Sequence, residues 1–415
     1  MRPNGANHLG MLLQNQHKLK IHGLMVLSQQ VLGSYEHLFR PASSNPKVLQ
    51  YFKEHSVEIA RLNGSHGIIE EHIRVAKLAV NAGLDLMLDL PGPKIRLGEI
   101  HDKSLVVKTG EKVIIEKEKQ KNEKNASNKE NHILILPCQF SIEKSTKIND
   151  IIYVDDGKLQ FRVLKVEANR IQAEALNNGP VKTHKGVNLP YGNIDIDFLT
   201  ENDHRLIENL LPIIKPKYVA TSFVKNINDI HRLKNAIQDA LLNIKDYYPE
   251  IIVKIEMAEA IEPSNITNII NESDMIMVAR GDLALETTPV HIRVPFIQTD
   301  LVQLCQKKNK PFIIATQILE SMIACPVPTR AEVSDLYRAV VIDKANYIML
   351  SSEAAIGLYP KECVTMMHDL IHYYQHSTIE SISSSKKFAN ETVSKRTLKT
   401  IKARKQSKTI KTESF

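Results

Sequence analysis

Two carboxylates and a lysine follow two apolar runs that lie close together in the sequence. Lys254 and Glu256 stand at the end of the run Ile251–Ile255, and Asp282 follows the run Met275–Ala279. Apolar residues at helical spacing between the runs predict a strand–helix–strand unit of a parallel sheet. Such a group at neighbouring strand ends could bind a hard cation and an anionic substrate together. A buried ion pair that only caps the sheet is the structural alternative.

Polar residues also follow other apolar runs of strand length. They are Arg61, Asn63, Ser65, Asp89, Arg96, Ser222, Thr316 and Glu353. Carboxylates such as Glu256 and Asp282 are the oxygen ligands that Mg²⁺ or Mn²⁺ prefers. Lys254, Arg61 and Arg96 would supply positive charge to a phosphoryl group during transfer, and Thr316 could deliver a proton to carbon. These residues predict metal-dependent chemistry on a small phosphorylated carboxylic acid.

The elements that must position these residues alternate between strand-like and helical patterns. This alternation predicts an α/β protein with a (β/α)8 barrel, whose catalytic residues lie at the carboxyl ends of the strands. Seven strand-like runs fit the pattern: VEIARL, LDLMLDL, KYVATSF, IIVKIE, MIMVARGD, PFIIATQ and NYIMLSSE. Residues 1–40 offer no convincing eighth strand. Short β-rich runs without helices between them in residues 99–184 predict a small inserted β domain.

The composition excludes several classes of protein. The net charge of +7 belongs to the C-terminal segment, because ten Lys/Arg and two Glu in residues 381–415 leave −1 for residues 1–380. The absence of Trp and of basic residues interleaved with aromatics argues against nucleic-acid binding by the body. No apolar run approaches the roughly 20 residues that span a membrane. Four distant cysteines without CxxC spacing and no secretory signal predict a cytoplasmic protein with reduced thiols.

The basic segment at residues 376–415 is Ser-, Lys- and Thr-rich, which is typical of a disordered tail. A solvated tail and an arm that binds a polyanion are both compatible with it.

The chain closely resembles the pyruvate kinase family in a series of motifs that occur in family order. They are ARLNGSHG (60–67), LDLPGPKIRLG (88–98), YVDDGKLQFRV (153–163), KGVNLP (185–190), VKIE (253–256), IMVARGDLALE (276–286), ATQILESM (315–322) and PTRAEVSD (328–335). The resemblance implies a barrel formed by residues 41–98 and 185–375 and a β-barrel lid domain at 99–184, with residues 1–40 an atypical N-terminal segment. It also implies the last step of glycolysis, phosphoryl transfer from phosphoenolpyruvate to ADP with Mg²⁺ or Mn²⁺, by a homo-oligomer.

The resemblance also implies roles by position. Lys254 would stabilise the transferring phosphoryl group, and Glu256 and Asp282 would hold the divalent metal. The positions implied to contact phosphoenolpyruvate are Arg61, Lys254, Gly281, Asp282 and Thr316, with Lys254, Thr316 and Arg61 as the catalytic set and Thr316 protonating the enolate. The positions implied to hold the nucleotide are Asn63, Gly64, Ser65, His66, Arg96 and Lys185.

The position of the monovalent cation departs from the family pattern. In potassium-dependent members the positions of Asn63, Ser65, Asp89 and Leu90 bind K⁺, but Leu90 has no side-chain oxygen. Lys94 stands where those members carry Glu. An ammonium can replace K⁺ by neutralising the same negative charge. The sequence therefore predicts an enzyme that does not require K⁺.

Other departures leave two alternatives open. Arg40 precedes Pro41 where the family has a Gly-Pro-Ala-Ser motif, Ser351–Ala355 reads SSEAA, and most of a C-terminal domain is expected to be absent. An inactive phosphoenolpyruvate-binding protein is the first alternative. A metal-dependent lyase or aldolase acting on pyruvate enolate is the second, although such an enzyme has no use for an inserted lid or for Lys185.

Overall fold

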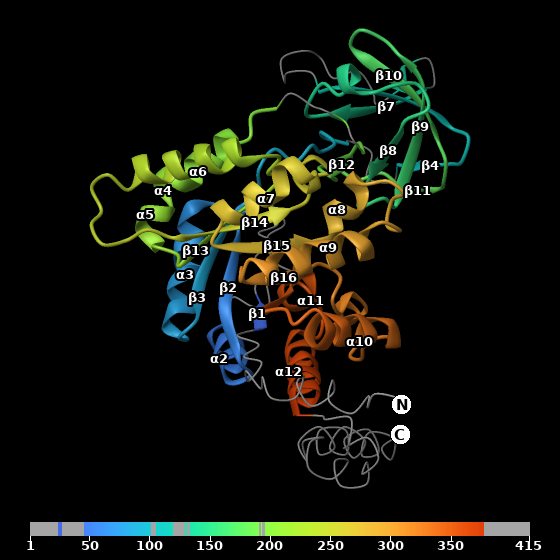
Figure 1. The fold of residues 1–415 in the computed structure, drawn as a ribbon. Helices are drawn as coiled ribbons and strands as arrows, with labels where there is room; N and C mark the ends of the chain where they lie inside the picture. The colour runs from blue at the N-terminus through green and yellow to red at the C-terminus, as the bar shows by residue number, and fades with distance from the viewer. Residues whose placement is uncertain are drawn as a thin grey trace, which may run out of the picture.

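Eight parallel strands close into a barrel (Figure 1). The computed structural model describes residues 24–26, 45–100, 105–118, 129–130, 133–190, 192 and 196–376. Around the barrel the strands are β1 (Leu24–Val26), β2 (Val57–Asn63), β3 (Asp85–Leu90), β13 (Tyr218–Thr221), β14 (Glu250–Ile255), β15 (Met275–Ala279), β16 (Phe312–Ala315) and β17 (Tyr347–Leu350). The predicted (β/α)8 barrel is confirmed.

The eighth strand, which the sequence did not reveal, is β1. Its three residues pair with Ile348–Leu350 of β17 on one side and with β2 on the other, which closes the barrel. A run as short as Leu24–Val26 gives no usable periodicity. The barrel therefore includes part of the segment 1–40, whose other residues lie outside the described part of the chain.

Helices surround the barrel and follow its strands in the order expected of β/α units (Figure 1). They are α2 (Pro46–Glu54), α3 (Ile69–Asn81), α4 (Glu201–Asn209), α5 (Leu211–Ile214), α6 (Ile227–Ala240), α7 (Pro263–Glu272), α8 (Arg280–Glu286), α9 (Val294–Lys307), α10 (Arg330–Tyr337), α11 (Ser352–Ala355) and α12 (Pro360–His376). Capping boxes at Thr200, Asn226 and Thr329 begin α4, α6 and α10 by satisfying free backbone N–H groups.

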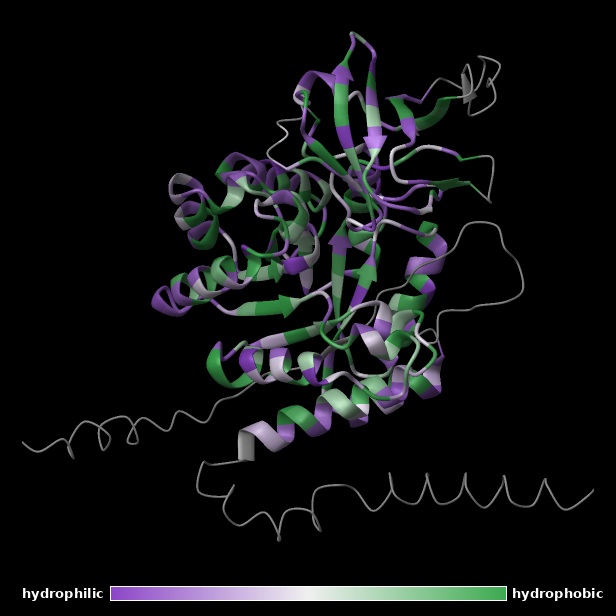
Figure 2. Cartoon of the chain, turned by 90° about the vertical axis from the view of Figure 1, so that its right-hand side faces the viewer, coloured by the Kyte–Doolittle hydropathy of each residue, from purple (hydrophilic) through white to green (hydrophobic). Residues whose placement is uncertain are grey.

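A β-rich lid domain is inserted after the third barrel strand, as predicted, and lies at one end of the barrel (Figure 1). Hydrophobic and hydrophilic residues alternate along its strands (Figure 2), so that one face of the sheet is buried. A seven-stranded sheet in the order β12-β8-β9-β10-β5-β7-β6 and the pair β11-β4 form it. The strands are β4 (Val106–Val107), β5 (Lys112–Lys117), β6 (Lys129–Glu130), β7 (Ile133–Cys138), β8 (Ile151–Val154), β9 (Leu159–Val166), β10 (Arg170–Ala175), β11 (Gly179–Pro180) and β12 (Val187–Asn188).

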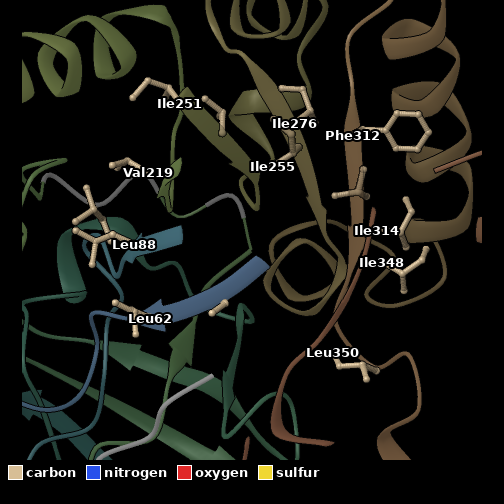
Figure 3. Close-up of a cluster of buried hydrophobic side chains, with 14 of the residues drawn as sticks. Leu62, Leu88, Val219, Ile251, Ile255, Ile276, Phe312, Ile314, Ile348 and Leu350 are labelled. Carbon is tan, nitrogen blue, oxygen red and sulfur yellow. The ribbon is translucent and has the colours of Figure 1, made fainter. Parts of the chain in front are cut away.

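In the barrel strands whose side chains the structure describes, alternate residues belong to different cores. In β16, Phe312 and Ile314 pack outward against the helices (Figure 3), whereas Ile313 and Ala315 fill the barrel interior. The same alternation runs through β14, where Ile251, Val253 and Ile255 face the helices. It follows from the two-residue period of a strand. Residues at even positions of β14 therefore point into the barrel, and this brings Lys254 to its mouth.

The state of the cysteines and the length of the helices can be read from the described residues. The four cysteines form no disulfide. Among the helices that the structure describes, none combines the length and apolar character needed to cross a bilayer. The basic segment that follows α12 lies outside the described residues.

The core between the barrel strands and the helices predicts that truncating two phenylalanines will change the free energy of unfolding by different amounts. Phe312 is 2% exposed, and Phe312→Ala should lower the free energy of unfolding by about 3–5 kcal/mol, because the cavity cannot close around the missing ring. Phe296 on α9 is 71% exposed, and Phe296→Ala should change it by less than about 0.5 kcal/mol. Urea unfolding followed by circular dichroism measures both, and equal effects would contradict the assignment of Phe312 to the core.

Candidate active site

The inward-facing residues at the carboxyl ends of strands β2, β3 and β14 form a polar layer. On β2 and β3, Ile59 and Met87 fill the barrel interior, and Arg61 and Asp89 come two residues later on the same faces. On β14, Ile252 is followed in the same way by Lys254. Strand periodicity alone thus brings a guanidinium, a carboxylate and an ammonium together.

The Lys254 ammonium is held by three oxygen atoms. Its Nζ lies 2.7 Å from Ser222 Oγ, 2.9 Å from Glu256 Oε1 and 3.4 Å from Asp89 Oδ1. The other oxygen of Asp89 accepts from Arg61 Nε at 2.6 Å. Ser222 Oγ in turn donates to the Leu90 carbonyl at 2.8 Å. Because every partner of Lys254 is itself fixed, its charge has a defined position.

Opposite charges keep these buried groups ionised. Burial lowers the pKa of Lys254, but the charges of Asp89 and Glu256 outweigh it and leave the pKa raised. Burial raises the pKa of Asp89, yet the neighbouring Arg61 and Lys254 hold that pKa below its usual value. The centre therefore carries a permanent cation–anion–cation arrangement at neutral pH.

Asp282 lies at the start of α8 and forms a second ionic centre with Lys94. Lys94 Nζ lies 2.8 Å from Asp282 Oδ1 and 3.0 Å from Oδ2. Asn188 Nδ2 donates to Asp282 Oδ1 at 3.3 Å and to Glu286 Oε1 at 2.8 Å. Although burial raises the pKa of Asp282, the charge of Lys94 leaves it lowered. Burial raises the pKa of Glu286 to about 8, so that Asp282 has a largely neutral neighbour at pH 7.

Glu256 lies between the two centres. Its Oε2 accepts from the Phe223 backbone N–H at 2.9 Å, and its Oε1 contacts Lys254. Burial raises its pKa, Lys254 opposes this, and the charge of Asp282 adds to the rise. The mutual influence of Glu256 and Asp282 shows that the two carboxylates share one electrostatic environment.

Both centres open into a cavity of about 260 Å³ below the lid. Its charged lining is balanced, with five cations against five carboxylates. The cations are Arg61, Lys94, Arg96, Lys185 and Lys254, and the carboxylates are Asp89, Asp155, Asp156, Glu256 and Asp282. Four of these cations already pair with carboxylates, namely Arg61, Lys94, Lys185 and Lys254, whereas Arg96 bonds the His184 carbonyl.

The pair Glu256 and Asp282 fits a hard divalent cation that keeps part of its coordination in water or substrate. Both carboxylates line the same cavity, and their oxygens are the preferred ligands of Mg²⁺. In the part of the chain that the structure describes, no group of three His, Cys, Asp or Glu side chains could hold a metal. A bound metal would compete with Lys94 and Lys254 for these oxygens.

The structure brings most of the predicted site residues into this cavity. Those that line it are Arg61, Asn63, Ser65, His66, Asp89, Lys94, Arg96, Lys185, Lys254, Glu256 and Asp282. Gly64, Gly281 and Thr316 are not in its lining. A Cβ on Gly64 would lie 2.5 Å from Leu206 Cδ1, and one on Gly281 would lie 2.8 Å from Thr316 Cγ2, so both glycines permit close packing.

The predicted cation position has a different arrangement from the one the family pattern implies. Leu90 packs in the core between the barrel strands and the helices, and it directs no group into the cavity. Asn63 Oδ1 accepts from the Ser65 N–H at 3.1 Å, and Asp89 is bound by Arg61 and Lys254. Lys94 shares the cavity but pairs with Asp282 rather than Asp89.

Three polar residues of this region were not predicted as site residues. Asp155 pairs with Lys185 at 2.9 Å, Asp156 lines the cavity, and Asn188 bonds Asp282. The residues Asp155, Asp156 and Gly157 are of types that favour turns. In the structure all three have positive φ. Asn188 lies in the motif KGVNLP, but no role was assigned to it from the sequence. Glu353, by contrast, accepts the N–H groups of Ser351 and Leu319 and serves to fix the loops around β17.

Comparisons with known proteins agree with this geometry. Residues 38–364 match the family model for the pyruvate kinase barrel domain. The chain is 36% identical over 334 residues to a pyruvate kinase of Buchnera aphidicola, covering 79% of this chain and 66% of that protein. It is 33% identical over 345 residues to a pyruvate kinase of Staphylococcus aureus, covering 80% and 54%. The chain thus spans between about half and two thirds of the length of these curated relatives.

A solved structure is similar as well. The crystal structure of a pyruvate kinase from Cryptosporidium parvum superposes with a TM-score of 0.74 at 27% sequence identity, covering 88% of this chain and 72% of that one. The family model covers most of the barrel and all of the inserted lid. From its barrel, its lid and the residues at the barrel mouth, the chain belongs to the pyruvate kinase family.

Proposed function

We propose that this chain transfers the phosphoryl group of phosphoenolpyruvate to ADP, giving pyruvate and ATP. The observation that carries the proposal is the fixed, charged Lys254 in one cavity with Arg61, Glu256 and Asp282. Turnover, rather than geometry, separates this enzyme from an inactive protein that only binds phosphoenolpyruvate. The lid residue Lys185 in the same cavity disfavours a lyase or aldolase.

Lys254 and Arg61 would stabilise the charge that spreads over the transferring phosphoryl group. Phosphoryl transfer depends mainly on positioning and electrostatics, and preorganised cations need no rearrangement during the reaction. Arg61 is oriented by its bond to Asp89, and Lys254 by Ser222. Both cations would therefore meet the phosphoryl oxygens in a fixed geometry.

Glu256 and Asp282 would hold Mg²⁺ or Mn²⁺. When bound, the metal would supply positive charge that neutralises the phosphoryl and carboxylate oxygens of the substrates. Lys94 would release Asp282 and turn its ammonium group to the anionic substrate, while Lys254 stays held by Ser222 and Asp89. The balanced charge of the cavity lining supports such an exchange, because metal and anion would then enter together.

The nucleotide would lie between the barrel and the lid. Arg96 and Lys185 would contact its phosphates, with Asn63, Gly64, Ser65 and His66 at the barrel side. Burial and the nearby Arg96 lower the pKa of His66, so its neutral imidazole is available as a hydrogen-bonding group. Thr316, one residue after β16, would protonate the enolate carbon directly or through a water molecule.

Potassium would not be required, because Lys94 places an ammonium in the cavity. The pKa of Lys94 is raised, since the charge of Asp282 outweighs the effect of burial. We also propose a cytoplasmic homo-oligomer. Ile356 and Leu358, which are 43% and 65% exposed, offer apolar surface after α11 for a subunit contact.

Removal of the Lys254 charge should abolish most of the activity. Lys254→Met should lower kcat by at least about 10²–10³-fold, as expected when a transition-state stabiliser is lost. A lactate-dehydrogenase-coupled assay with phosphoenolpyruvate, ADP and Mg²⁺ measures this. Lys217 is the matched control, because it forms an ion pair with Asp85 at the other end of the barrel strands, and Lys217→Met should keep full activity. A wild-type chain that is folded without ligands but shows no turnover would support the alternative that the protein only binds phosphoenolpyruvate.

Activity should be the same in K⁺, Na⁺ and Tris buffers. Lys94→Gln should lower kcat/KM by about 10-fold or more, because one cation is lost from a site that handles several negative charges. Lys165, a lid residue whose side chain is 61% exposed and pairs with Glu167, provides the control Lys165→Gln, which should leave kcat/KM unchanged. A wild-type enzyme that is active only with K⁺ would refute the role of Lys94.

A further inference from the structure

Thr316 adopts a backbone conformation that a β-branched residue rarely takes. Its φ is +75°, and the next residue, Gln317, has a φ of +54°. Outside glycine, this left-handed region is uncommon, and a bulky β-branched residue there is an outlier. Such a conformation costs about 1–3 kcal/mol and persists only where surrounding contacts enforce it. The structure must therefore contain groups that hold Thr316 in place.

Arg280 supplies those contacts to the backbone. Its Nη2 donates to the Thr316 carbonyl at 2.7 Å, and its Nε lies 3.3 Å from the same oxygen. The same guanidinium also donates to the carbonyls of Ala315 at 3.2 Å and Gln317 at 3.4 Å. One rigid, planar group thus bonds three consecutive carbonyls where β16 ends.

Asp335 on α10 fixes the guanidinium from the other side. Arg280 Nη1 lies 2.8 Å and 2.6 Å from the two carboxylate oxygens of Asp335. The Arg280 side chain is 11% exposed and that of Asp335 is 31% exposed, so the guanidinium is the more shielded member of this ion pair. The start of α10 is anchored in turn, because Glu332 accepts from Ser321 N at 2.7 Å and Ser321 Oγ at 2.6 Å.

Gly281 completes the fit between α8 and Thr316. A Cβ at position 281 would lie 2.8 Å from Thr316 Cγ2, so the threonine side chain packs directly on the glycine backbone. Asp282 follows immediately and lines the cavity. Three consecutive residues therefore fix the end of β16, make room for Thr316 and bring a carboxylate to the site.

We propose that Arg280 and Asp335 act as positioning residues that hold the Thr316 hydroxyl where it protonates the enolate of pyruvate. This inference rests on the proposed function. In the step, the enolate carbon forms a bond to the proton of the threonine hydroxyl, directly or through water, and the threonine oxygen regains a proton from solvent. None of these three residues lines the cavity, but Thr316 packs on Gly281, directly before the cavity residue Asp282, so Arg280 and Asp335 are placed to act through Thr316.

The test separates proton transfer from substrate binding in Arg280→Lys and Asp335→Asn. Both variants should lower kcat and the exchange of pyruvate methyl protons with D₂O by about 10- to 100-fold, as a misplaced catalytic group does. The exchange is followed by NMR in the presence of Mg²⁺ and ATP. KM for phosphoenolpyruvate should change far less than kcat, and the solvent isotope effect on kcat should rise. Thr316→Val should show the same signature.

Matched controls come from an exposed ion pair between Arg232 and Asp197. Arg232→Lys and Asp197→Asn should leave both rates unchanged, and thermal melting reports whether each variant is folded. If Arg280→Lys does not fold, Asp335→Asn gives the same comparison with the guanidinium retained. If the folded Arg280 and Asp335 variants exchange pyruvate methyl protons at the normal rate while Thr316→Val exchanges them slowly, this inference is wrong. The proposed function would still stand. Absence of pyruvate formation by the wild type would overturn the proposed function and this inference with it.

Discussion

The site depends on one interaction, the burial of the Lys254 ammonium at the mouth of the barrel. A charge in this position is tolerated only when opposite charges and hydrogen bonds replace water. Asp89 and Glu256 supply the charge, and Ser222 supplies an oxygen. Asp89 also binds Arg61, so a second cation is fixed by the same carboxylate. Loss of either carboxylate would leave a buried cation without compensation, which links the stability of the barrel mouth to its chemistry.

The second ionic centre joins the barrel to the lid. Asn188 lies in β12, which pairs with β8 of the lid sheet, and its amide bonds both Asp282 and Glu286 of α8. Lys94, just after β3, binds Asp282 from the other side. The carboxylate is thus oriented by groups on both chain segments that connect the barrel to the lid. Its geometry is set before any ligand arrives, as preorganised sites require.

Much of this arrangement follows from the sequence, because strand periodicity and strand ends are local properties. The alternation in β14 places Lys254 inside the barrel, and the motifs identify Asp282 and Arg61. The pairing of Lys94 with Asp282 could not be predicted, since it joins residues 188 positions apart and depends on side-chain conformation. The three-residue strand β1 is too short for a periodic signal. The left-handed conformation of Thr316 has no local signature at all, because distant contacts from Arg280 impose it.

The equal number of cations and carboxylates around the cavity has a kinetic consequence. A site with no net charge creates little long-range field, and electrostatic steering of ligands depends on such a field. The lining itself then adds little steering for a charged ligand, and little dependence on ionic strength. Under the proposed function, discrimination among small phosphates would begin after arrival, when internal ion pairs exchange partners with the ligand.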